Sequence, residues 1–163
     1  RWNLIFHALG ISFDGRIFEQ YFREKLFFSA VPEPGAVELL EYLSRRYRLC
    51  IASNGPYEQQ INRLRLGNMY DFFTHFFVSS QIGAQKPSAA FFDFCFNELR
   101  SSGFPNLVPE ETIIIGDSLS SDIAGGAGYG MHTCLYQKQP APALDTSKAE
   151  HIVRSLAEIQ QIL

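Results

Sequence analysis

Residues 112–122 read Thr-Ile-Ile-Ile-Gly-Asp-Ser-Leu-Ser-Ser-Asp, and this stretch decides the fold class. The β-branched run at 112–115 predicts a buried strand that ends at Gly116. Asp117 follows the strand directly, and Asp122 lies in the next loop or in the first turn of a short helix. Because open parallel sheets bind ligands at the carboxyl ends of their strands, both carboxylates are expected at a ligand-binding edge.

The spacing of Asp117 and Asp122 allows both carboxylates to converge on one hard cation. Mg²⁺ prefers oxygen ligands, and proteins commonly hold it with one or two carboxylates together with substrate phosphate. The alternative for Asp122 is a helix cap, a contact that contributes about 1 kcal/mol to helix stability. The pair therefore predicts a magnesium site, with the capping role left open for Asp122.

The chain around this stretch alternates between short apolar runs and amphipathic helical segments, which indicates a parallel sheet covered on both faces. We expect an α/β fold, a three-layer Rossmann-like core with a parallel sheet. The expected strands lie at 49–52, 76–78, 112–116 and 132–136, and the expected helices at 36–46, 57–66, 88–99 and 153–163, with a short helix after Asp117 and a Pro/Ala-rich surface connection at 137–148.

The amino-terminal part differs from this core. Apolar residues at helical spacing predict one helix over 1–9 and a second helix capped by Asp14. The many phenylalanines of this helical hairpin are more typical of packing than of ligand binding. Two prolines and a glycine in Val31–Gly35 resist helix continuation, so the domain boundary is expected there, between residues 1–30 and 31–163.

Two further polar segments lie where loops should meet the sheet edge. Ser53, Asn54 and Gly55 follow the strand at 49–52, and their hydroxyl and backbone N–H groups could hold phosphate oxygens. The same tripeptide is also an ordinary turn sequence. Lys86 precedes the helix at 88–99, where it is either a solvated lysine or a cation that neutralises phosphate. The order of these segments along the chain favours one shared phosphate site.

Composition excludes several classes of protein. The 163 residues are 46% apolar and 19% charged, and 14 basic against 17 acidic residues give a net charge of -3. This balance argues against disorder and against a nucleic-acid polymer as partner, and no apolar run reaches the roughly 20 residues of a membrane span. The three cysteines are isolated and no export signal is visible, so we expect a reducing, cytoplasmic compartment.

The sequence resembles the haloacid dehalogenase-like (HAD) superfamily, most of whose members are phosphatases. The resemblance lies in three motifs and in their order and spacing along the chain: the Ser-Asn-Gly loop, the Lys-Pro segment and Gly-Asp-Ser-x-x-Ser-Asp-Ile. Within the superfamily, these motifs resemble those of the noncanonical pyrimidine nucleotidases and related sugar-phosphate phosphatases. The resemblance implies that residues 1–30 are the later part of a helical cap. The roles it implies are phosphoryl binding by Ser53 with Asn54 and Gly55, charge stabilisation by Lys86, and magnesium binding by Asp117 and Asp122.

One motif of the resembled family is absent. The family begins with a strand that ends in Asp-x-Asp, where the first carboxylate attacks phosphorus and the second is the general acid and base. The sequence contains no such motif, and Asp14 is rejected because its flanks are helical. We therefore expect that the printed chain lacks its amino-terminal segment. The missing strand would lie between those at 48–52 and 112–116, which should be unpaired and roughly 10 Å apart.

The implied function is a magnesium-dependent phosphatase that hydrolyses a small phosphate monoester, a nucleotide or a sugar phosphate, through an aspartyl-phosphate in the intact protein. One alternative is a 2-haloacid dehalogenase-like hydrolase, although Asp117 favours phosphate chemistry. Another is a noncatalytic phosphate-binding domain. A dinucleotide site at 126–130 is rejected because those glycines precede a strand instead of following one.

Overall fold

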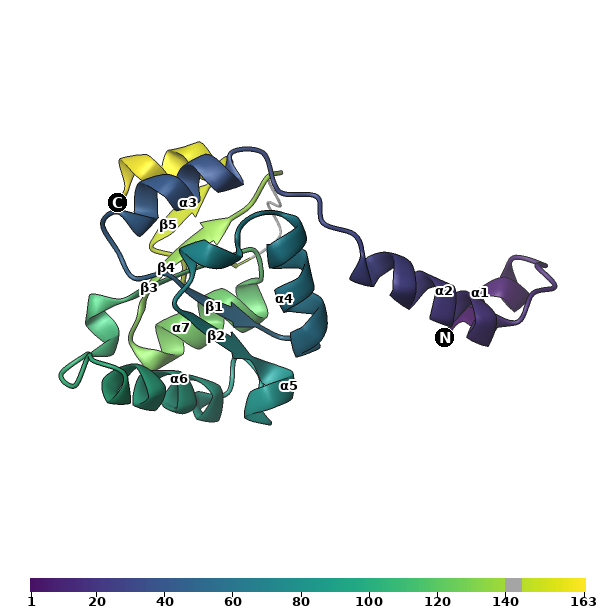
Figure 1. Ribbon diagram of the computed structural model, residues 1–163, viewed down its shortest axis with the longest axis horizontal. Coiled ribbons are helices and arrows are strands. Elements are labelled where there is room, and N and C mark those ends of the chain that lie inside the picture. Colours follow the sequence, from purple (N-terminus) through teal and green to yellow (C-terminus); the bar gives the residue numbers. More distant parts are fainter. Residues whose placement is uncertain (140–144) are drawn as a thin grey trace.

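The computed structural model describes residues 1–139 and 145–163, which form an α/β core and a helical arm that projects from it (Figure 1). None of the helices in these ranges is long and apolar enough to cross a lipid bilayer. In chain order the helices and strands are α1 (Trp2–Ala8), α2 (Gly15–Phe27), α3 (Ala36–Ser44), β1 (Cys50–Ser53), α4 (Tyr57–Leu66), β2 (His75–Val78), α5 (Ser79–Ile82), α6 (Ala89–Ser101), β3 (Ile113–Gly116), α7 (Ala124–Tyr129), β4 (His132–Tyr136) and β5 (His151–Val153), with short 3-10 or π turns at Tyr70–Phe72, Pro109–Glu111, Leu119–Ile123 and Leu156–Gln161.

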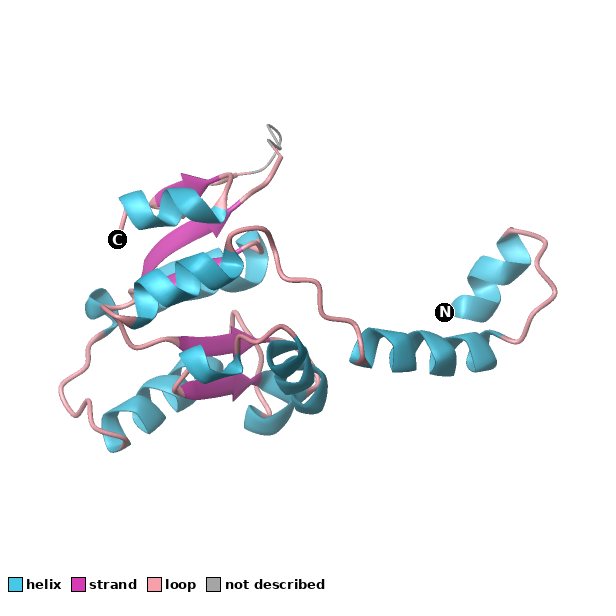
Figure 2. Ribbon diagram, turned by 45° about the horizontal axis from the view of Figure 1, so that its top comes forward, coloured by secondary structure: helices cyan, strands magenta, loops and turns pink. Residues whose placement is uncertain are grey.

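The strands are parallel and lie in two groups, as Figure 2 shows. In the first group β1 pairs with β2, with Cys50 opposite His75 and Ser53 opposite Val78. In the second group β4 lies between β3 and β5. Within the described ranges β1 and β3 are not hydrogen-bonded to each other, so β1 and β3 each have one unpaired edge. The α/β class with parallel strands is confirmed, and the direct pairing that would have contradicted our expectation is not found.

Two clusters of buried side chains hold the core together. The first joins α3 to β4, β5 and the carboxyl-terminal turn, through Leu39, Leu43, Cys134, Val153 and Ile159. The second takes residues from both groups of strands and from α6, namely Phe77, Phe91, Phe92, Cys95 and Ile114. Since β2 contributes Phe77 and β3 contributes Ile114, helix α6 packs against both groups and connects them.

Glycines allow α7 to lie close against β3. A Cβ atom on Gly126 would overlap the side chain of Ile114, and a Cβ atom on Gly125 would press on the ring of Phe92. Gly130 then ends the helix in the left-handed region, with φ of 89°. Gly126 is therefore a packing residue and Gly130 a turn residue, whereas Gly128 lies within α7 with open space around it.

The arm consists of α1 and α2 packed against each other. The ring of Trp2 lies 4.5 Å from that of Phe18 and 5.3 Å from that of Phe22, measured between centroids. The predicted cap is confirmed, because the Asp14 carboxylate accepts a hydrogen bond of 2.8 Å from the Arg16 N–H. The rings pack as expected, but several apolar side chains predicted for the buried face are exposed instead, among them Leu9, Ile17 and Tyr21.

The prediction of a helix over 153–163 is confirmed only in part. A 3-10 helix spans Leu156–Gln161, but Val153 is the last residue of strand β5, which pairs with β4 and was not predicted. A strand of three residues is too short to show a period of two, and its formation depends on the neighbouring edge of β4. Of the expected connection at 137–148, residues 140–144 lie outside the described residues.

Candidate active site

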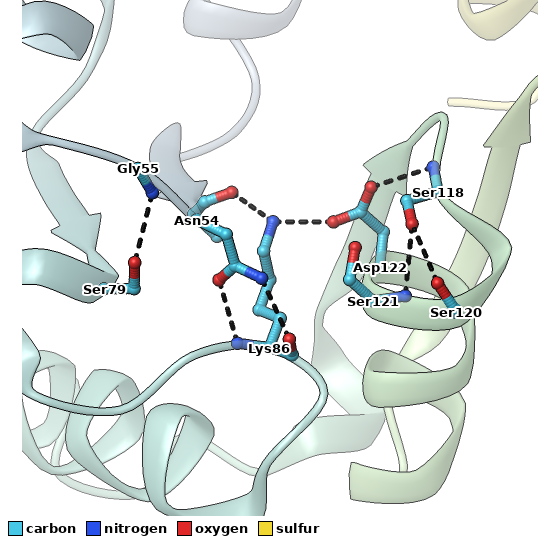
Figure 3. Close-up of polar contacts among 9 residues, drawn as sticks. Asn54, Gly55, Ser79, Lys86, Ser118, Ser120, Ser121 and Asp122 are labelled. Carbon is cyan, nitrogen blue, oxygen red and sulfur yellow. Dashed lines mark hydrogen bonds and ion pairs between the residues drawn. The ribbon is translucent and has the colours of Figure 1, made fainter. Parts of the chain in front are cut away.

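Three segments that are distant in the sequence meet at the carboxyl ends of β1 and β3. Ser53 is the last residue of β1, and Gly116 is the last residue of β3. Lys86 comes from the loop between α5 and α6, and its side chain reaches between the ends of β1 and β3 (Figure 3). Parallel strands that end at the same edge bring their following loops together, as the sequence predicted.

Lys86 is the centre of the polar contacts. Only 7% of the residue is exposed, and its Nζ lies 2.6 Å from Oδ1 of Asp122 and also donates to the backbone carbonyl of Ala52. A buried ammonium is tolerated because it has an opposite charge and a carbonyl as partners. The solvated-surface interpretation of this lysine is therefore wrong. An ammonium has three N–H donors, so one donor remains after these two contacts.

Asp122 has both carboxylate oxygens engaged. Oδ1 pairs with Lys86, and Oδ2 accepts a hydrogen bond of 3.1 Å from the Ser118 N–H. The absence of a side chain at Gly116 leaves room for this carboxylate, since a Cβ atom there would overlap it. The capping alternative for Asp122 is not what the structure has, because the Oγ of Ser118 caps the turn by accepting from the Ser121 N–H at 3.2 Å.

The predicted Ser-Asn-Gly loop is fixed by contacts within the protein. The side-chain amide of Asn54 makes two hydrogen bonds of 2.9 Å to the backbone N–H and C=O of Lys86. The Gly55 N–H donates to Oγ of Ser79 at 3.1 Å, which places the segment after β2 against the segment after β1. These polar groups of Asn54 and Gly55 are therefore used to build the edge of the site.

Ser53 and Asp117 are positioned differently. Ser53 is half-buried, Asp117 is exposed, and the side chains of both make no hydrogen bond or ion pair within residues 1–139 and 145–163. The structure thus joins Asn54 and Asp122 to Lys86, but no hydrogen bond or ion pair involves the Asp117 side chain in those ranges. The side chains of Ser53 and Asp117 and the third N–H of Lys86 are therefore available for a ligand.

The residues at this edge fit a magnesium ion held largely by water and substrate. The described part of the chain contains no group of three or more His, Cys, Asp or Glu side chains suited to a metal. Mg²⁺ does not require such a cage, because it usually retains several waters and takes one or two carboxylates together with phosphate oxygens. The exposed Asp117 carboxylate is the direct ligand that this arrangement offers.

The cysteines are not competing nucleophiles. Burial raises the pKa of the Cys50 thiol in β1, raises that of Cys95 to about 12 and raises that of Cys134 to about 11. The thiolate is the reactive form of cysteine, and at neutral pH these thiols are protonated.

Sequence reasoning missed Ser118 and Ser79. Ser118 could have been found as a helix cap, since serine before a turn with a free N–H three residues later is a standard signal. Ser79 could have been found by its place, because it follows the apolar run at 76–78 as Ser53 follows that at 49–52.

Comparison with known proteins identifies the family. The HAD-hydrolase-like family model matches residues 83–159. The HAD-hydrolase YfnB of Bacillus subtilis is 32% identical over 163 residues, covering 100% of this chain and 67% of YfnB. The pyrimidine 5'-nucleotidase PynA of Streptococcus pneumoniae is 34% identical over 137 residues, covering 83% of this chain and 56% of PynA. The glyceraldehyde 3-phosphate phosphatase of Pyrococcus furiosus is 33% identical over 132 residues, covering 80% of this chain and 52% of that enzyme. The chain thus spans between about half and two thirds of these relatives.

The fold comparison agrees with the sequence comparison. The crystal structure of YfnB, described as bound to magnesium and as revealing interdomain movement, superposes with a TM-score of 0.89 and covers 98% of this chain and 68% of YfnB. An α/β fold with parallel strands, a buried lysine between two strand ends and a relative that matches along the full chain lead to one conclusion. The chain belongs to the haloacid dehalogenase-like (HAD) family of hydrolases.

Proposed function

We propose that the intact protein is a magnesium-dependent phosphatase that hydrolyses a small phosphate monoester. The observation that carries this proposal is the buried Lys86–Asp122 ion pair, which places an ammonium at the meeting point of the loops after β1 and β3. Its remaining N–H donor and the free hydroxyl of Ser53 are groups suited to phosphoryl oxygens. The relatives named as phosphatases and nucleotidases support the same chemistry.

Asp117 is the proposed direct ligand of magnesium, and Asp122 contributes by holding Lys86 and the Ser118 backbone. When bound there, magnesium would offset negative charge on the phosphoryl oxygens. This division of roles refines the expectation that both carboxylates bind the metal. It is supported by the exposure of Asp117 and by the engagement of both oxygens of Asp122.

The proposed nucleophile is an aspartate outside these 163 residues. Its carboxylate oxygen attacks phosphorus, the ester P–O bond breaks, and the leaving alcohol takes a proton from a second carboxylic acid. Water then attacks phosphorus of the aspartyl-phosphate and gives a proton to the second carboxylate. The P–O bond to the aspartate breaks, which releases inorganic phosphate and restores both carboxyl groups. The unpaired edges of β1 and β3 support a position for the strand that carries this aspartate, because each edge offers free backbone N–H and C=O groups.

Nucleoside monophosphates are the proposed substrates, with sugar phosphates as the second choice. The 34% identity to a protein named pyrimidine 5'-nucleotidase supports the first, and the 33% identity to a glyceraldehyde 3-phosphate phosphatase supports the second. The arm, proposed as part of the cap, would contact the leaving group. A panel of phosphate esters assayed with the intact protein decides between the two classes.

The test of the phosphatase proposal is hydrolysis of p-nitrophenyl phosphate by the intact protein. Lys86→Ala should lower kcat by about 100-fold or more, which is typical for loss of one group that stabilises transition-state charge. Lys148→Ala, at an exposed lysine, is the matched control. If the intact protein does not hydrolyse the ester, the phosphatase proposal is wrong. If Lys86→Ala hydrolyses the ester at the parental rate, the charge-stabilising role of Lys86 is wrong. If the intact protein binds phosphate without turnover, the noncatalytic alternative is correct.

A further inference from the structure

Asn54 holds the backbone of Lys86 at two points. The Lys86 N–H donates to Oδ1 of Asn54, and Nδ2 of Asn54 donates to the Lys86 carbonyl, each at 2.9 Å. Figure 3 shows both contacts side by side. The amide thus pairs with Lys86 as a neighbouring strand residue would, through one donor and one acceptor. Both polar atoms of Asn54 therefore take part in holding Lys86, and one N–H of its amide group remains after these two contacts.

The type of residue at position 54 follows from this pairing. A primary amide presents a donor and an acceptor next to each other, whereas a carboxylate has only acceptors and a hydroxyl is shorter. The partner of Asn54 lies 32 positions later in the chain. In residues 1–139 and 145–163, Asn54 is the sole hydrogen-bond partner of the Lys86 backbone N–H and C=O. The loop around Lys86 therefore depends on this amide for its position.

Fixing the backbone of Lys86 matters because its side chain is long. A lysine stem has four carbons and many rotamers, so a small backbone shift moves the ammonium by a large distance. In the structure Nζ has to meet the Ala52 carbonyl and Oδ1 of Asp122 at the same time. Ala52 and Asn54 are both at the end of β1, so the same strand end holds the lysine at its backbone and at its ammonium.

We propose that Asn54 is a positioning residue that holds Lys86 in its buried, Asp122-paired conformation. This inference rests on the proposed function only in taking Lys86 as the group that meets the phosphoryl oxygens. The placement of Lys86 by Asn54 is a property of the 163-residue chain itself. It is therefore measurable without catalysis, and its test is separate from that of the phosphatase activity.

The decisive experiment is amine acetylation of the chain, with each lysine quantified by peptide mass spectrometry. In the parent protein Lys86 should react more slowly than the exposed Lys25 and Lys148, which are internal standards. In Asn54→Ala the acetylation rate of Lys86 alone should rise by roughly tenfold, as expected from the loss of two hydrogen bonds. Asn106→Ala, at an exposed loop asparagine, is the matched control and should leave Lys86 protected.

A conservative variant separates positioning from general stability. Asn54→Asp retains the acceptor for the Lys86 N–H and loses the donor to its carbonyl, so acetylation of Lys86 should lie between the parent and Asn54→Ala. This variant also serves if Asn54→Ala does not fold. An unchanged acetylation rate of Lys86 in folded Asn54→Ala and Asn54→Asp overturns the inference. Reactivity of Lys86 equal to that of Lys25 and Lys148, together with loss of the native circular dichroism spectrum in both variants, overturns it as well, because it indicates global unfolding.

Kinetics of the intact protein complete the test. If Asn54 acts through Lys86, Asn54→Ala should lower kcat, as Lys86→Ala does. The variant that carries both substitutions should then be no slower than Lys86→Ala. A further loss in the double variant shows that Asn54 touches substrate independently and contradicts the positioning role. Absence of phosphate-ester hydrolysis by the intact parent protein rejects the proposed function, while the acetylation result still decides the placement of Lys86.

Discussion

At the scale of single residues, Asp117 and Asp122 differ in environment although they belong to one sequence motif. Asp122 is 6% exposed and both its oxygens are bonded, whereas Asp117 is exposed and has no ion pair in the described part of the chain. Removal of one partner from a buried ion pair leaves an uncompensated charge, which is costly. Removal of an exposed charge has little effect on stability.

We therefore predict that Asp122→Asn lowers the free energy of unfolding by about 3–5 kcal/mol, and that Asp117→Asn changes it by less than about 0.5 kcal/mol. Urea denaturation followed by circular dichroism measures both values on the same chain. Equal destabilisation by the two substitutions would contradict the assignment of Asp122 to the ion pair with Lys86.

A second prediction concerns magnesium. Asp117→Asn should abolish or strongly weaken Mg²⁺ binding by the chain, because it removes the carboxylate that is free to coordinate the ion. Calorimetric titration with MgCl₂ gives the affinity, and Asp71→Asn, at another exposed aspartate, is the control. In the intact protein the same Asp117→Asn substitution should lower magnesium-dependent turnover by about 100-fold. Normal binding and turnover in Asp117→Asn would remove the metal assignment.

Gly116→Ala provides a third prediction at this scale. A methyl group at this position would overlap the Asp122 carboxylate, so the carboxylate has to move away from Lys86. The expected result is faster acetylation of Lys86 together with a loss of stability. Gly128→Ala is the control, because a methyl group there meets no atom within 4 Å. Unchanged protection of Lys86 in Gly116→Ala would show that the site accommodates the methyl group without losing the ion pair.

At the scale of elements, the linker between α2 and α3 is attached to the core by Glu33. Its Oε1 accepts hydrogen bonds from the Tyr136 hydroxyl at 2.8 Å and from the Lys138 Nζ at 2.5 Å. Tyr136 is the last residue of β4, so the linker is held at the carboxyl edge of the sheet. The end of α2 is held separately, since Nδ2 of Asn62 in α4 donates to the Phe27 carbonyl at 2.5 Å.

The attachment by Glu33 should depend on pH. The hydrogen bond from Lys138 and, to a smaller extent, that from Tyr136 lower the pKa of Glu33 below the ordinary glutamate value of 4.5. A carboxylate whose pKa is lowered by folding contributes stability that is fully present above the unfolded pKa and is lost as pH falls through the lower folded pKa. Glu33→Gln should therefore speed amide hydrogen exchange in the linker at pH 7, with the difference from the parent vanishing below the folded pKa. A difference that is independent of pH would contradict an ionic attachment.

At the scale of the whole molecule, the two groups of strands are connected through side chains of α6. Phe91 is completely buried in the cluster that contains Phe77 of β2 and Ile114 of β3. Because β1 and β3 share no hydrogen bonds in the described residues, this apolar contact carries much of the connection. Burial of large aromatic side chains is the main favourable term available for such a contact.

We predict that Phe91→Ala lowers the free energy of unfolding by about 3–5 kcal/mol, as is typical for a large-to-small substitution in a core. Phe94→Ala on the same helix is the matched control, because the side chain of Phe94 is 46% exposed. Urea denaturation gives the two free energies, and hydrogen exchange shows whether β1 and β2 exchange before β3 and β4 in Phe91→Ala. Similar stabilities for the two variants would show that α6 does not connect the two groups.

The sequence predicted much of this architecture because its signals are local. Apolar runs such as 112–115 and the caps and prolines between them depend on residues that are adjacent in the chain, so the order of strands and helices and the α/β class could be inferred. Strand β5 could not, because three residues carry no detectable period and the strand exists through its pairing with β4. The candidate site is predictable for the same reason. The loops that carry Ser53, Lys86 and Asp117 follow predicted strands or precede a predicted helix, and these places in the chain indicate a ligand-binding edge.

By itself, the sequence determined the family resemblance, the parallel α/β core and the edge at which the polar residues gather, since these follow from residue type and order. Only the tertiary structure decided what each polar side chain does there. Lys86 is buried. Its ammonium pairs with Asp122, 36 positions later in the chain, and its backbone is hydrogen-bonded by Asn54, 32 positions earlier. Such partners are selected by packing between distant segments, because a buried charge or amide is stable only where the fold supplies its complement.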